Sequence, residues 1–85
     1  MLYVRMSFED TIEILEELKD EGVPKNIGQN IDEVILCLKN KTIEKNLIIS
    51  KALSILEEVT ENINLDPMLR TQFLNVSSIL EGMLS

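Results

Sequence analysis

The sequence contains no histidine and no tryptophan, and it has one cysteine, Cys37, among 85 residues. Without histidine the commonest general base, the serine–histidine nucleophile and most zinc sites are excluded. A single cysteine excludes an intramolecular disulfide and suits a reducing compartment. We therefore expect a cytoplasmic protein that is not an enzyme and that has no cofactor or resident metal.

Other components of common binding sites are also scarce. The three glycines are too scattered to form a phosphate-binding loop, and aromatic residues make up only 4% of the chain, too few for a base-stacking platform. No apolar run approaches the ~18 residues of a membrane span. The N-terminus carries one basic residue, Arg5, and soon becomes acidic, which does not fit a signal peptide. No membrane partner is expected.

The chain is short of positive charge. Its formal net charge is −7, and an acidic chain repels the phosphate backbone that supplies most nucleic-acid affinity. The lysines of the middle segment are too dilute to reverse this balance (Lys25, Lys39, Lys41, Lys45, Lys51). A nucleic-acid partner is therefore not expected.

An internal repeat is the most informative feature that is present. Ile-Leu-Glu-Glu occurs at residues 14–17 and again at residues 55–58. Each copy ends a helical pattern and is followed by a short break, a proline (Pro24 or Pro67) and a second helical pattern. The chain is thus predicted to contain two helical hairpins with a period of about 42 residues.

Local signals place four helices, at about residues 7–21, 24–39, 43–61 and 67–84. Each helix has signals at its ends: Ser7 with Asp10 resembles a capping box, Gly22 is a left-handed terminator, Pro24 opens the second helix, Thr42 caps the third, and Asp66-Pro67 opens the fourth.

Each predicted helix has an apolar stripe at helical spacing. The third stripe is the widest, so the third helix is expected to be the most buried. The stripes comprise Phe8, Ile12, Leu15 and Leu18, with Ile14 at the edge; Ile27, Ile31, Val34, Ile35 and Leu38; Ile48, Ile49, Ala52, Leu53, Ile55, Leu56 and Val59; and Leu69, Phe73, Val76, Leu80 and Met83.

These features predict a single all-α domain spanning residues 1–85. Short loops force neighbouring helices to be antiparallel, which gives a four-helix up-down bundle built from two HEAT-like hairpins. Two repeats are too few for a free solenoid, which favours a compact bundle. Residues 1–6 are expected to form an arm or a weakly ordered segment. Met6-Ser7 would be an equally good start of the chain, so residues 1–5 are alternatively an over-called start.

The outer side of the fourth helix is predicted to be an interface with a second subunit or a partner helix. A fully solvated face would normally carry lysine and glutamate, whereas small uncharged residues flanked by apolar ones let another helix approach closely. The alternative is that the monomer itself covers both sides of the helix. The predicted interface consists of Thr71, Asn75, Ser78 and Gly82, flanked by Met68, Ile79 and Leu74.

The acidic face of the first helix is the one dense cluster of functional groups in the sequence. We interpret it as a solvated face; the alternatives are weak binding of Mg²⁺ or Ca²⁺ and contact with a basic partner. The cluster comprises Glu13, Glu16, Glu17 and Asp20. Cys37, off the core stripe of its helix, is interpreted as a packing residue, with a reactive thiol as the alternative.

The sequence resembles a small archaeal family of uncharacterised proteins whose members are short, acidic and all-helical. The resemblance covers most of residues 7–82. It rests on Val23-Pro24-Lys25-Asn26-Ile27, on Arg70-Thr71-Gln72 and on Asn75-Val76 with Ser78-Ile79-Leu80-Glu81. Gly28 stands where the family often has a basic residue, and Phe73 where a larger aromatic is common. The resemblance implies a helical bundle in a cytoplasmic, archaeal setting and no known activity.

Taken together, these features favour a non-enzymatic protein–protein interaction or self-assembling module. Its expected partner is a second copy of the chain or another helical protein. A metal-dependent protein using the first helix, or a nucleic-acid accessory protein, is the alternative.

Overall fold

The computed structural model describes residues 7–84, so the predicted arm at residues 1–6 lies outside the described residues. The described residues form four α-helices and no strand, which confirms the all-α class. The helices are α1 (Phe8–Asp20), α2 (Lys25–Lys39), α3 (Lys45–Glu61) and α4 (Pro67–Glu81).

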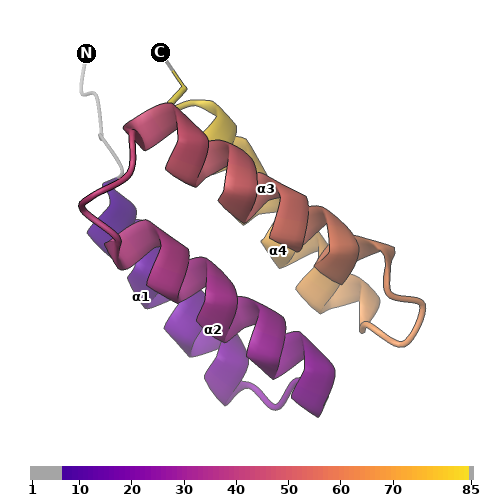
Figure 1. Ribbon diagram of the computed structural model, residues 1–85. Coiled ribbons are helices and arrows are strands. Elements are labelled where there is room, and N and C mark those ends of the chain that lie inside the picture. The colour runs from indigo at the N-terminus through magenta and orange to yellow at the C-terminus, as the bar shows by residue number, and fades with distance from the viewer. Residues whose placement is uncertain (1–6, 85) are drawn as a thin grey trace, which may run out of the picture.

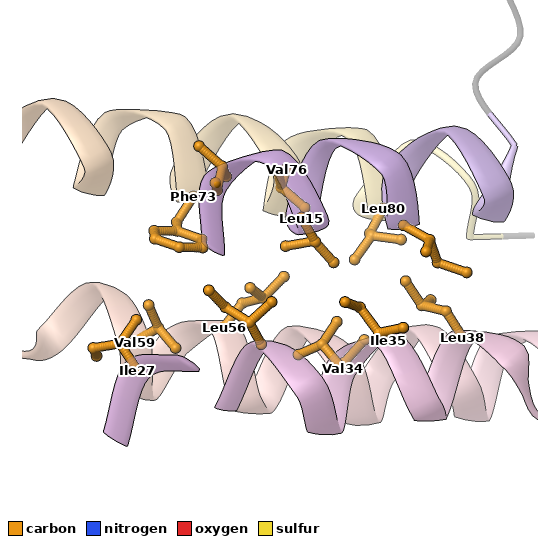
Figure 2. Packing of buried hydrophobic residues seen from close by; sticks show 14 of the residues in the cluster. Leu15, Ile27, Val34, Ile35, Leu38, Leu56, Val59, Phe73, Val76 and Leu80 are labelled. Carbon is orange, nitrogen blue, oxygen red and sulfur yellow. The ribbon is translucent and has the colours of Figure 1, made fainter. Parts of the chain in front are cut away.

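The helices form a closed up-down bundle (Figure 1). Each helix contacts the next one along the chain, and α1 also contacts α4, so the two predicted hairpins close on each other. In cross-section α1 and α4 form one layer and α2 and α3 the other, with the core between them (Figure 2). The start of α1, the end of α4 and the α2–α3 connection share one end of the bundle (Figure 1).

The core consists of the predicted apolar stripes turned inward (Figure 2). Phe73 is the largest fully buried side chain. Phe8, Leu69 and Met83, which lie near the ends of their stripes, are only half-buried. The largest fully buried side chains are Phe73, Leu15, Ile27, Ile31, Ile49, Leu56, Leu80, Val34, Val59, Val76 and Thr11.

The two copies of the repeat occupy equivalent positions in the bundle. Leu15 and Leu56 are fully buried, while both Glu-Glu pairs, residues 16–17 and 57–58, are exposed. Both pairs of carboxylates thus lie on the outer surface of the bundle. The repeat therefore marks one surface position and one core position of each hairpin.

The prediction that the third helix is the most buried is wrong. In α2 six of 15 residues are buried, and in α3 five of 17. Leu53 and Ile55 of the wide apolar arc are only half-buried, and Leu47 is exposed. In a closed ring of four helices each helix has two neighbours, so the edges of a wide arc stay at the surface.

The predicted capping box of α1 is present. The Ser7 backbone N–H donates to Asp10 Oδ2 at 2.9 Å, and the Asp10 N–H donates to Ser7 Oγ at 3.2 Å. Gly22 has φ 90°, the left-handed conformation predicted for it. At the start of α4, the Met68 N–H donates to Asp66 Oδ1 at 2.8 Å, and Pro67 is the first helical residue. These local signals were correctly interpreted.

Two predicted helix starts are wrong. Thr42 does not cap α3, whose N-cap residue is Glu44 with no side-chain hydrogen bond. Instead the Thr42 N–H and hydroxyl both donate to Asn40 Oδ1, at 2.9 and 2.7 Å. This side-chain turn competes with the helix and delays it. Pro24 is the N-cap residue of α2 rather than its first helical residue.

Two glycines are expected to respond to alanine in opposite ways. Gly22→Ala should lower the free energy of unfolding by about 1 kcal/mol, because a Cβ is strained at positive φ. Gly28→Ala should raise it by about 0.5–1 kcal/mol, because alanine favours a helix interior. At Gly28 the new Cβ would meet Val23 Cγ2 at 3.8 Å and Lys19 Cε at 3.9 Å, which are ordinary contacts. Urea unfolding measures both changes, and shifts of the same sign would contradict this assignment.

Candidate functional site

The outer side of α4 is exposed in the bundle. Of the predicted interface residues, Thr71, Asn75, Ser78 and Gly82 are exposed. Met68 is 75% exposed, and only Ile79 is half-buried. Residues 7–84 of the monomer therefore leave the outer side of this helix uncovered. The helix presents an uncharged surface with protruding apolar side chains, because its Phe73–Val76–Leu80 stripe faces the core.

An open hollow of about 1600 Å³ lies at the end of the bundle where α1 begins and α4 ends. Ser78, Ile79 and Gly82 line it, so the structure brings three of the predicted interface residues to its wall. Met68, Thr71 and Asn75 are not among its lining residues within the described part of the chain. Of the pairs of neighbouring helices, α1 and α4 have the least contact with each other. Several apolar side chains around the hollow are therefore incompletely covered. These are Phe8, Ile43, Ile79, Met83 and Leu84, whereas Ile12, Leu38 and Ile48 also line the hollow but are buried.

The sequence pattern did not predict this hollow. Phe8 and Met83 had been assigned to core stripes, but they line the hollow and are half-buried. Ile43 and Leu84 are 38% and 43% exposed. An isolated isoleucine in the polar segment between the second and third helices was the one available signal, because a solvated turn does not need a large apolar side chain.

The sides of the hollow carry charges of opposite sign. Glu9 and Glu16 line it from α1. Lys39, Lys41 and Lys45 line it from the end of α2, the connection and the start of α3. The hollow therefore has an acidic rim and a basic rim around an apolar lining.

The acidic face of α1 does not gather into a metal site. Glu13, Glu16, Glu17 and Asp20 are all exposed along the helix. In residues 7–84 no group of three or more His, Cys, Asp or Glu side chains is placed to hold a metal ion. Lys19, on the same helix, forms an ion pair with Asp32 of α2 at 2.7 Å. The convergence that a metal-dependent function would require is not seen among these residues.

Cys37 packs at the edge of the core. It is half-buried, and its thiol Sγ lies 3.5 Å from the carbonyl oxygen of Ile48 in α3. This placement matches the predicted packing role, with the thiol acting as a weak donor between two helices.

Arg70 has a structural position that sequence analysis missed. Its Nε donates to the Thr60 carbonyl oxygen at 2.9 Å. Its Nη2 donates to the carbonyl oxygens of Asn62 at 2.9 Å and Leu65 at 3.4 Å. The guanidinium thus satisfies carbonyls at the C-terminal end of α3 and in the α3–α4 loop, where a cation also complements the helix dipole. The available signal was that Arg70, in the first turn, is the one basic residue of α4.

Residues 3–83 match the family model described as "Uncharacterised protein family (UPF0147)". The chain belongs to this family. It is 30% identical to a UPF0147 protein of Methanosarcina acetivorans over 86 aligned residues, which cover 92% of this chain and 89% of the relative. It is 34% identical to a UPF0147 protein of Pyrococcus horikoshii, with 95% and 89% covered. No solved structure gives a significant match.

Membership of UPF0147 confirms the resemblance to an archaeal family of uncharacterised proteins. The matched residues include all four helices and almost all of the hollow. None of the described helices is both long and apolar enough to cross a membrane. The description of this family names no activity.

Proposed function

We propose that this UPF0147 chain is a non-enzymatic protein–protein interaction module that self-assembles through the outer side of α4. The observation that carries the proposal is the exposure of an uncharged helix face. Thr71, Asn75 and Ser78 are exposed there without a lysine or glutamate among them. Small side chains without charge let a second helix approach closely and leave no ion to desolvate.

Apolar side chains beside this face support the same proposal. Met68 is 75% exposed and Leu74 is 51% exposed, both on α4. Burial of apolar area contributes about 25 cal/mol per Å², so covering both side chains stabilises an assembly. Methionine also adapts well to a partner surface.

The composition supports a module without catalytic chemistry. The chain has no histidine, and its carboxylates are spread over exposed helix faces, where they favour solubility. With a net charge of −7, protein rather than nucleic acid is the proposed partner. The single cysteine fits the proposed cytoplasmic setting. No specific observation favours the alternative of a metal-dependent protein.

Ser78→Arg is the variant that tests this proposal. A long charged side chain on the uncharged face should block close approach and reduce the assembly to monomers. Ser50→Arg is the matched control, because Ser50 is an exposed serine on α3 and does not line the hollow. Light scattering on both purified variants gives the molar mass.

The expected result is a loss of assembly for Ser78→Arg alone, with an unchanged circular dichroism spectrum. An unchanged assembly state and melting temperature for Ser78→Arg would refute the role of this face. Equal loss in both variants would show that added charge, and not its location, disrupts the assembly.

A further inference from the structure

The hollow at the end of the bundle combines features that suit one kind of partner. It has an apolar lining, including Ile43 and Leu84, which are 38% and 43% exposed. Its acidic rim, Glu9 and Glu16, comes from α1, and its basic rim, which includes Lys41, comes from the α2–α3 side. A surface with an apolar centre and charged edges is typical of a protein interface.

We propose that a second copy of this chain docks on the hollow, with the two copies related by a twofold axis. The inference rests on the proposed self-assembly and specifies its geometry. Glu9 and Glu16 of each copy then face Lys39, Lys41 and Lys45 of the other. The apolar linings of the two hollows cover each other at the centre of the interface.

Symmetry favours a second copy as the occupant. In a twofold interface the same patch is used by both subunits, so the patch must be complementary to itself. A hollow with rims of opposite charge meets this requirement, because the rotation brings each acidic rim to the other copy's basic rim. Two chains with net charge −7 repel each other over most orientations, and this pairing replaces repulsion by attraction at the contact.

The position of α4 agrees with this geometry. Ser78 and Gly82 lie on the wall of the hollow and are exposed. Small residues at this point let the second copy approach the α4 backbone. The hollow and the C-terminal half of the α4 face thus form one continuous surface.

Two variants, each with the charges of one rim reversed, test the proposal. The basic-rim variant carries Lys41→Glu with Lys45→Glu, and the acidic-rim variant carries Glu9→Lys with Glu16→Lys. In each variant alone both rims have the same sign, so self-association should weaken by at least about tenfold. In an equimolar mixture the two variants are complementary again and should form a heterodimer.

Light scattering of each variant and of the mixture supplies the result, and circular dichroism confirms that each variant remains helical. Restored dimer mass in the mixture supports the proposal. If both variants stay dimeric while Ser78→Arg is monomeric, self-assembly stands and this geometry is overturned. Two folded monomeric variants that do not recover on mixing also overturn it.

Other occupants of the hollow give distinct outcomes. A wild-type chain that is monomeric, and whose melting temperature falls when residues 1–6 are removed, would assign the hollow to the chain's own N-terminal segment and overturn the proposal. A monomeric chain that binds a short apolar peptide at the hollow would assign it to a different protein and would equally overturn the proposal.

Discussion

Phe73→Ala should lower the free energy of unfolding by about 3–5 kcal/mol. The phenylalanine is fully buried and is the largest such side chain in the core (Figure 2). Its removal deletes apolar contacts from the α4 stripe and leaves a cavity between the two layers. For a chain of this length the total stability is roughly 4–13 kcal/mol, so the variant should be close to unfolding. Urea titration followed by circular dichroism measures the change.

The adjacent residue supplies the control. Leu74 is on the same helix but is 51% exposed. In the Ser78→Arg background, where no assembly covers Leu74, Leu74→Ala should therefore change the unfolding free energy by less than about 1 kcal/mol. Similar losses at Phe73 and Leu74 would mean that α4 faces the core with a different side from the one described.

Arg70→Ala should lower the free energy of unfolding by about 2–3 kcal/mol, the largest effect expected outside the apolar core. The guanidinium donates to Thr60, Asn62 and Leu65 carbonyl oxygens at 2.9, 2.9 and 3.4 Å. Without it these acceptors lose a charged donor at the junction of α3 and α4. Hydrogen bonds to charged groups contribute more than neutral ones, and part of the loss is the cost of leaving partly buried carbonyls unpaired.

Arg70→Lys separates geometry from charge. A lysine ammonium keeps the positive charge near the end of α3 but cannot reproduce the planar fork of the guanidinium. It should restore less than half of the stability lost in Arg70→Ala, as measured by urea unfolding. Full restoration by lysine would show that the helix dipole alone, and not the three-carbonyl contact, accounts for the effect.

The fold could be predicted because its signals are local. Ser7 with Asp10, Gly22 and Asp66-Pro67 each act on the backbone within a few residues, and all three were correctly interpreted. The apolar residues repeat with a helical period, and no segment has the alternating pattern of a strand. The repeated Ile-Leu-Glu-Glu segment indicated two equivalent hairpins because equivalent positions in a bundle require the same burial.

The error at the start of α3 occurred where two local effects compete. Thr42 is a good N-cap residue, but the side chain of Asn40 captures both its N–H and its hydroxyl. Helix α3 therefore begins at Lys45. The sequence alone does not show whether Thr42 caps the helix or joins a turn with Asn40, because both arrangements are possible within three residues.

The candidate site was only half predicted, for a different reason. The outer face of α4 follows from one helical wheel, and so Ser78 and Gly82 could be identified. The hollow depends on where the four helices end relative to one another. No single segment of the sequence contains that information. Arg70 is similar, since its acceptors belong to the preceding helix and loop.

The molar mass of the wild-type chain in solution tests the central claim most directly. Light scattering should give twice the 9.7 kDa mass of one chain, and Ser78→Arg should return the mass to that of one chain. A wild-type mass of one chain at every concentration measured would contradict the proposal that this bundle assembles through α4 and the hollow beside it.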